Sequence, residues 1–140
     1  NSISDVLPSN YIYGIAHDIT NDILSIATTG GALVIKNISN YMNTNSVNEE
    51  DVLVFTNRNG LVGTSCYSVA YTIDNKLILG TANGLSITSN YSSFQSLTTS
   101  SNELGGTDLL SSHICNRIVR KTKNTYTIIH GIGLSEGISI

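Results

Sequence analysis

The chain has 140 residues, of which 40% are hydrophobic and 12% are charged, and its formal net charge is −3 at pH 7. The hydrophobic content excludes a disordered chain, the acidic balance argues against a nucleic-acid surface, and no apolar run approaches the roughly 18–20 residues that cross a bilayer. We therefore expect one globular domain with no nucleic-acid partner and no membrane insertion.

Residues 2–6 alternate apolar and polar side chains with a period of two, which predicts a strand that supplies the missing outer strand of the third unit described below, in the same chain or from another copy. From there on, short apolar runs follow one another, rich in Ile, Val, Leu, Tyr and Thr. These residues fit a pleated, buried surface. We predict strands at residues 12–16, 23–28, 31–35, 52–55, 66–70, 77–81, 84–87, 94–97, 115–119, 126–131 and 133–138.

The predicted strands recur in sets about 50 residues apart, and Asn, Gly, Asp and Ser fill the turns between them. Asn21-Asp22, Asp74-Asn75 and Lys123-Asn124 separate the first strand from the second at matching positions in the three sets. Residues 37–51 are long and polar, so we predict a loop there, with room for one helical turn. Helical periodicity is weak throughout.

Units of three or four short strands with this spacing are typical of a β-propeller. Several strands, such as residues 23–26, are apolar with little alternation, which indicates that both of their faces are buried. We therefore predict an all-β fold of about three four-stranded antiparallel propeller blades in an incomplete ring. Residues 1–140 form one segment, with repeats at about 7–56, 61–98 and 110–140.

Short motifs in the first two repeats match a known pattern. They are Leu7-Pro8-Ser9-Asn10 followed by Ile12 and Ile15, Asn59-Gly60-Leu61 followed by Cys66 and Val69, Leu79-Gly80-Thr81, and Asn83-Gly84-Leu85. In this respect the chain resembles the two-component regulator propeller repeat. That family carries Asn-Gly-Leu-Pro-Ser-Asn, two apolar residues three apart, Leu-Trp-Ile-Gly-Thr and a Gly-Leu turn.

The chain departs from that family at the Trp position, which holds Ser25, Ile78 and Ile128, and Gly131 replaces Thr in the third repeat. The resemblance implies the propeller fold. It does not by itself imply signal transduction, because one fold serves many functions.

An arc of three blades leaves an apolar face open at each end, whereas closed propellers have four to eight blades. Two such faces represent roughly 10–20 kcal/mol of unrealised burial at about 25 cal/mol per Å2. We therefore expect other protein chains, or further copies of this one, to complete the propeller. The sequence is compatible with two alternatives: a six-bladed ring of two copies, and a longer chain of the same fold of which this is one piece.

The residues that commonly carry catalysis or bind metals form no recognisable motif here. Cys66 and Cys115 occupy one repeat position and are predicted to be small buried residues, with a disulfide between them as the alternative. The spacing of His17, His113 and His130 fits no zinc site. Asp18, Asn21 and Asp22 are predicted to form a turn. We predict no catalytic residue, no metal and no cofactor.

Tyrosines in and near the loops are the best candidates for recognition. Tyr41 and Tyr91 follow third strands at related positions, and Tyr13 and Tyr71 lie on first strands. Tyrosine amid Ser and Asn makes an adaptable binding surface. His17 is added because it can face a central channel. The predicted binding residues are thus Tyr13, His17, Tyr41, Tyr71 and Tyr91.

These observations favour a non-enzymatic structural or recognition module of a larger assembly. A virion or phage-tail component, or a cell-surface protein, that binds a partner protein or a glycan fits the uncharged polar composition, and the predicted location is extracellular or virion. The alternative is a ligand-sensing extracellular domain of a signalling receptor. A sialidase- or lyase-like enzyme is a further alternative, which seven Lys and Arg residues make hard to build.

Overall fold

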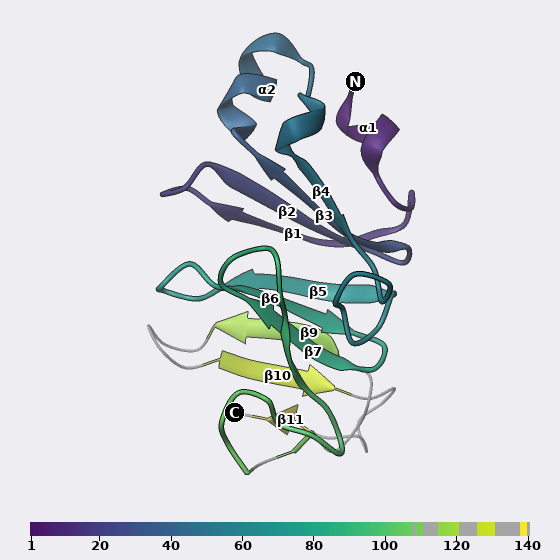
Figure 1. Cartoon of the computed structure of the whole chain (residues 1–140), viewed down its shortest axis with the longest axis vertical. Helices are drawn as coiled ribbons and strands as arrows, with labels where there is room; N and C mark the ends of the chain where they lie inside the picture. Colours follow the sequence, from purple (N-terminus) through teal and green to yellow (C-terminus); the bar gives the residue numbers. More distant parts are fainter. Residues whose placement is uncertain (108, 111–114, 121–125, 131–137, 140) are drawn as a thin grey trace.

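A computed structural model describes residues 1–107, 109–110, 115–120, 126–130 and 138–139. Over these residues the fold is all-β with few helices, as predicted, and the strands form antiparallel sheets stacked in layers (Figure 1). The elements are α1 (Ile3–Val6), β1 (Ile12–Asp18), β2 (Ile23–Thr28), β3 (Gly31–Lys36), α2 (Ile38–Thr44), a 3-10 turn (Glu49–Asp51), β4 (Val52–Phe55), β5 (Cys66–Tyr71), β6 (Leu77–Thr81), β7 (Gly84–Thr88), β8 (Gln95–Leu97), β9 (Cys115–Arg120), β10 (Tyr126–His130) and β11 (Ile138–Ser139).

Each sheet is a meander in which every strand pairs with its neighbour in the sequence. The first sheet has the order β1-β2-β3-β4 and the second has the order β5-β6-β7-β8, so two four-stranded antiparallel sheets are confirmed. The described part of the third sheet pairs β9 with β10 and β10 with β11. Strands that are adjacent in sequence need only short connections, which the Asn- and Gly-rich turns supply.

A β-bulge occurs at the same place in the first strand of every sheet. The extra residue is Tyr13 on β1, Tyr67 on β5 and Asn116 on β9, as the register shifts show. A bulge adds one residue to one strand, bends that strand and increases its twist. The three sheets therefore share a backbone irregularity as well as a strand order.

The Gly-Thr motifs have a steric and a hydrogen-bonding role in the hairpin between the second and third strands. Thr28 and Thr81 donate from Oγ1 to the carbonyl oxygens of Gly31 and Gly84, each at 2.8 Å. Gly84 has a φ of 132°, and a Cβ there would lie 2.5 Å from the carbonyl oxygen of Leu97 on β8. Only glycine combines this dihedral angle with so close an approach of the outer strand.

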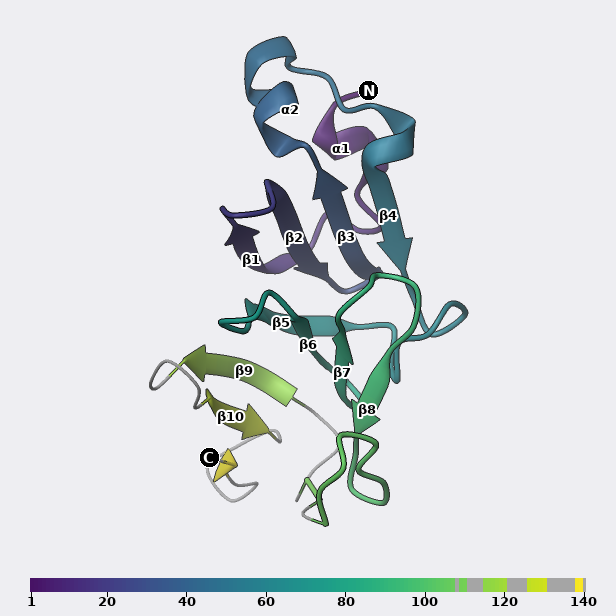
Figure 2. The same cartoon turned by 60° about the vertical axis from the view of Figure 1, so that its left-hand side comes forward.

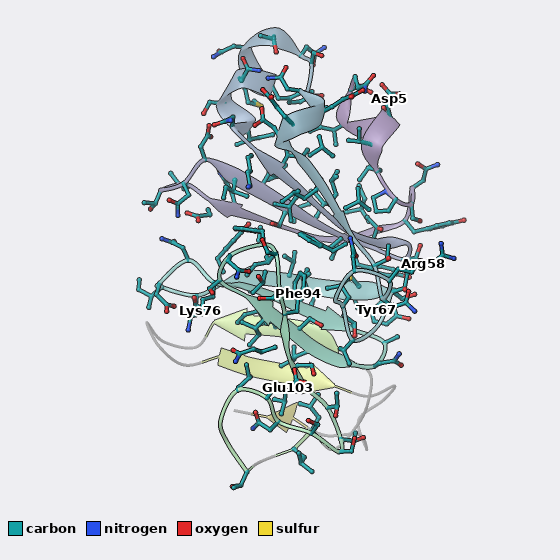
Figure 3. All side chains as sticks on the ribbon, in the orientation of Figure 1. Asp5, Arg58, Tyr67, Lys76, Phe94 and Glu103 are labelled. Carbon is teal, nitrogen blue, oxygen red and sulfur yellow. The ribbon has the colours of Figure 1, made fainter. Side chains whose placement is uncertain are left out.

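Apolar clusters fill the space between neighbouring sheets. Between the first and second sheets lies a core that includes Val34, Phe55, Leu77 and Leu79, and the ring of Phe94 meets Phe55 edge-on at 5.0 Å between centroids (Figure 3). Between the second and third sheets Ile118 packs against a cluster that contains Ile78, Leu85 and Leu110. The central strands are buried on both faces because each lies between two layers, as their continuous apolar runs predicted.

The prediction of a strand at residues 2–6 is wrong, because these residues form the helix α1. The Ser2 backbone N–H donates to Asp5 Oδ2 at 2.8 Å, and the Ser2 hydroxyl donates to the same atom at 2.9 Å. These two hydrogen bonds from Ser2 to the Asp5 carboxylate hold the first turn and favour a helix over the alternating strand pattern. Residues 37–51 were predicted to be a loop with at most one helical turn. They contain the helix α2 and a 3-10 turn, so the prediction underestimated their helical content.

The two helices cover the face of the first sheet that points away from the second sheet. Ile38 and Val47 are buried against Ile26, Leu33 and Ile35, and side chains of α1 join the same cluster. We call this layer the helical cap. The apolar face that an incomplete ring was expected to leave open is therefore covered over its central strands. Exposed large side chains remain on or beside β1, where they are Tyr11, Ile12, Tyr13, Ile15 and Ile19, and Met42 on α2 and Val54 on β4 are exposed as well.

Candidate functional site

The best candidate site is a cleft of about 330 Å3 where the first and second sheets meet. It lies between the β1–β2 turn and the β5–β6 turn, which project from the same side of the stack in Figure 1. We call it the rim cleft. It is lined by Ala16, His17, Asp18, Ile19, Thr20, Tyr71, Thr72, Ile73 and Asn75.

Tyr71 is held in the wall of the rim cleft by two hydroxyl groups. Its phenolic oxygen lies 2.5 Å from Ser25 Oγ on β2 of the other sheet, and the Tyr91 hydroxyl donates to it at 3.2 Å. Burial raises the pKa values of Tyr71 and Tyr91 above the usual range, so both stay neutral. Lys36 Nζ lies 5.7 Å from the centre of the Tyr91 ring. The network ties the two sheets together behind the cleft.

Asp18 shapes the first turn of the rim cleft. Its side chain is buried, and it accepts hydrogen bonds from the Asn21 backbone N–H at 3.1 Å and from Asn21 Nδ2 at 2.8 Å. This side-chain-to-backbone arrangement is an Asx turn. The predicted turn is present, and the carboxylate is engaged in it, so Asp18 contributes mainly negative charge and shape to the cleft.

Thr72 plays the corresponding part in the second turn of the rim cleft. Its Oγ1 accepts from the Lys76 N–H at 2.8 Å and donates to Asp74 Oδ1 at 2.5 Å, which lowers the pKa of that exposed carboxyl. Asn75 occupies the turn with a φ of 62°. Lys76, at the end of this turn, lies on the same side of the stack as the cleft (Figure 3).

The chemistry of the rim cleft suits binding by hydrogen bonds. Threonine hydroxyls, the Asn75 amide and the His17 imidazole all supply hydrogen-bond donors or acceptors to the rim cleft. Ile19, which is 80% exposed, and Ile73, which is 47% exposed, add an apolar flank on each turn. A small neutral polar ligand with an apolar side matches this lining.

A second, mostly apolar pocket of about 300 Å3 lies on the other side of His17, under the helical cap. We call it the cap pocket; its lining residues are Ile3, His17, Asp22, Leu24, Ile38, Ser39, Tyr41 and Met42. Asp22 holds the start of α2 beside this pocket. The Asp22 carboxylate accepts hydrogen bonds from the Ser39 backbone N–H and, at 2.7 Å, from the Ser39 hydroxyl. His17 thus contributes to both cavities.

The structure brings only some of the predicted binding residues together. His17 and Tyr71 line the rim cleft, and Tyr91 stands behind it. Tyr41 is in the cap pocket. Tyr13 lies near the other end of β1, where its ring meets that of Tyr67 edge-on at 5.3 Å. The five residues therefore do not form one site, although three of them act at the rim cleft.

The turn residues of the rim cleft were not among the predicted binding residues. The sequence carried a usable signal for them, because the two turns occupy the same position in successive repeats and adjacent sheets place equivalent turns side by side. Asn75 was predicted to lie in a turn, and the convergence of Thr72 and Asn75 with the first turn follows only from the packing of one sheet on the next.

Cys66 is a free thiol and is fully buried. The prediction that it is a small buried residue is therefore confirmed. Burial raises the pKa of this thiol to about 12, so it stays protonated. His113 lies outside the described residues, as do the side chains of His130 and Cys115. Among the residues that the structure does describe, no three of His, Cys, Asp or Glu gather into a metal site.

No known family model matches this chain. No curated protein matches it either. Solved structures do match it, and two of them are extracellular domains of BT4673 from B. thetaiotaomicron, described in one case as a one-component system and in the other as a hybrid two-component system. The TM-scores are 0.58 and 0.59, the identities are 18% and 20%, and each match covers 86% of this chain.

The chain spans 14% of the length of each of these two structures, so the likeness concerns one part of a much longer domain. At this identity it shows a shared fold. No helix within the described residues is long and apolar enough to cross a bilayer. The neighbours in fold are therefore extracellular parts of a signalling system.

Proposed function

We propose that this chain is part of the extracellular ligand-sensing domain of a signalling receptor, and that it is built from β-propeller blades. The observation that carries the proposal is the match over 86% of the chain to extracellular domains of a signalling system. The proposed blades correspond to the repeats at about 7–56, 61–98 and 110–140.

The packing of the sheets supports their assignment as blades. In both views the first strand of each sheet, β1, β5 and β9, lies beside the first strand of the next, and the sheets are stacked face to face (Figure 2). Each sheet is a four-stranded meander or the described part of one. This order of strands and layers is the one that a propeller requires.

The rim cleft is the proposed ligand site. A ligand held there contacts Thr20 on one turn and Asn75 on the other, and therefore bridges two sheets. The Tyr71–Ser25 hydrogen bond joins the two sheets behind the cleft. Binding then stabilises one relative position of the sheets, which is the change that a receptor can transmit.

Nothing in the structural neighbours supports a virion or phage-tail component, which was the first hypothesis from composition. An enzyme is also less suitable, because the carboxylate in the rim cleft, Asp18, is engaged in its own turn. The signalling interpretation accounts for the fold match and for the cleft together.

The test is a binding screen followed by two matched variants of the full chain. Uniformly 15N-labelled protein is titrated with a panel of neutral saccharides, amino acids and short peptides, and amide shifts are followed by NMR. Asn75 and Asn45 both have left-handed dihedral angles, with φ of 62° and 59°, and only Asn75 lines the rim cleft. Glycine preserves that dihedral angle at both positions.

We expect at least one compound to shift the amides of the two rim-cleft turns. Asn75→Gly should weaken its binding at least about fivefold, which corresponds to losing about one hydrogen bond. Asn45→Gly should leave the affinity unchanged. A panel that shifts no rim-cleft amide, or a compound whose affinity is the same in both variants, contradicts the proposal.

A further inference from the structure

One position of the repeat is half-buried in the second and third sheets and exposed in the first. It lies two residues after the bulge and is occupied by Ile15 on β1, Val69 on β5 and Ile118 on β9. Val69 and Ile118 are partly buried, whereas Ile15 is 60% exposed. The same residue type thus lacks in the first sheet a cover that it has in the other two.

Val69 is shielded from solvent by the first strand of the preceding sheet, β1. A Cβ on Gly14 would lie 3.4 Å from Val69 Cγ1, so this side chain sits against the bare backbone of β1. On either side of it Tyr67 meets Tyr13 and Tyr71 meets Ser25. At Gly14 and Ser25, large side chains on the first strand of one sheet therefore pack onto small residues of the preceding sheet.

Ile118 repeats this contact one layer further on. It packs against the cluster of Ile78 and Leu85 in the second sheet, so its cover also comes from the preceding sheet. On β1 the residues at the corresponding positions are Ile12, Ile15 and His17, of which Ile12 is 46% exposed. We call these three residues the β1 outer face.

The helical cap leaves Ile12 and Ile15 of the β1 outer face exposed and reaches only His17, which lines the cap pocket. Ile38 and Val47 of the cap are buried against residues of β2 and β3, and none of the three β1 residues belongs to that cluster. The open surface is therefore as wide as a first strand, and its long axis follows β1. An exposed apolar strip of this kind marks an interaction surface.

We propose that the β1 outer face binds the first strand of a further sheet of the same repeat, with small residues in the places of Gly14 and Ala16. The inference rests on the blade assignment in the proposed function and does not depend on the ligand. The solved neighbours extend far beyond the matched part, which is 14% of their length, so further repeats of the same fold are the natural occupant.

A second copy of this chain fits less well as the occupant. Its third sheet would have to offer small residues to the β1 outer face, and β9 carries Arg117 and Val119 where β1 carries Gly14 and Ala16. Residues larger than Gly and Ala at these register positions do not match the contact around Val69.

The test extends the chain by one repeat. Residues 1–60 are placed directly before residues 7–140, so that Leu7 follows Gly60 as Leu61 does in the native chain. The inner copy of Ile15 then has a sheet in front of it, and the outer copy does not. Ile15→Ala is made in either copy, and the folding equilibrium constant is measured by denaturant unfolding.

We expect Ile15→Ala in the inner copy to lower the folding equilibrium constant at least about tenfold, because truncation of a covered Ile leaves a cavity. The same change in the outer copy should alter it less than about twofold. Equal effects in both copies overturn the proposal. So does an added repeat that stays unfolded, seen as a set of disordered NMR amide signals beside a native remainder.

A further measurement separates the alternative occupant and the ligand. Light scattering of the 140-residue chain that shows a dimer, dissociated by Ile15→Asp, assigns the β1 outer face to a second copy and overturns the proposal. Failure of the ligand screen leaves the cavity comparison unaffected, since Asn75 and Ile15 lie in different places, so the two proposals fail independently.

Discussion

The Tyr71 hydroxyl on β5 lies 2.5 Å from the Ser25 hydroxyl on β2, and this hydrogen bond joins two different sheets. Ser25 is fully buried. Tyr71→Phe should therefore destabilise the fold by about 1–3 kcal/mol, because it leaves a buried hydroxyl without this partner. Ser25→Ala added to Tyr71→Phe should recover part of the loss, and a double-mutant cycle by denaturant unfolding measures the coupling. Strictly additive losses would contradict a direct interaction.

Gly84 and Gly105 both have positive φ values, of 132° and 93°, and differ in their surroundings. A Cβ on Gly84 would lie 2.5 Å from the Leu97 carbonyl oxygen, whereas nothing lies within 4 Å of one on Gly105. Gly105→Ala should cost about 1 kcal/mol from the dihedral angle alone. Gly84→Ala should cost clearly more, because β8 must also move. Equal free energies of unfolding for the two variants would refute the steric role.

Cys66 should make stability fall as the pH rises through the alkaline range. Burial raises the pKa of its thiol from 9.0 to about 12 in the folded chain. Above pH 9 the unfolded thiol loses its proton while the folded thiol keeps it, so the stabilisation is complete below that pH and decreases up to about pH 12. The slope between pH 8.5 and pH 10 should be smaller in Cys66→Ala. The native thiol should also resist alkylation at pH 8, and rapid labelling would contradict its burial.

Asp22 should hold the start of α2 through Ser39. Asp22→Gly preserves the positive φ of 58° and removes the carboxylate that accepts from the Ser39 N–H and hydroxyl. Loss of this cap should cost about 1 kcal/mol and speed hydrogen exchange at the amides of α2. Asp22→Asn, which retains an acceptor oxygen, should have a smaller effect. Unchanged exchange in the glycine variant would show that α2 is held by its apolar contacts alone.

The sheets could be predicted from the sequence because their signals are local. Runs such as those of β2 and β6 are mostly apolar, and Asn, Asp and Gly mark the turns between them. The Gly at position 84 follows from the same logic, since the hairpin needs a dihedral angle that other residues avoid. Alternation alone was not sufficient at residues 2–6, where the Ser2–Asp5 capping interaction decides in favour of a helix.

The rim cleft and the helical cap could not be predicted in the same way, because both depend on contacts between segments distant in sequence. Asp22 caps α2 from 17 residues away, and Tyr71 reaches Ser25 across 46 residues. Neither contact leaves a periodic pattern. Tyr91 and Tyr71 were predicted to be binding residues because of their residue type. Only the stacking of the sheets shows that the Tyr91 hydroxyl donates to the Tyr71 hydroxyl, which in turn meets Ser25.

The sequential pairing of strands within each sheet has a consequence for how the molecule acquires its structure. Because β1 to β4 pair only with their neighbours along the chain, the first sheet and the helical cap are complete within residues 1–55. Short loops cost little entropy to close, and topologies of this kind fold quickly for their size. The first sheet can therefore assemble while the rest is still being synthesised, and each later sheet adds to a surface that already exists.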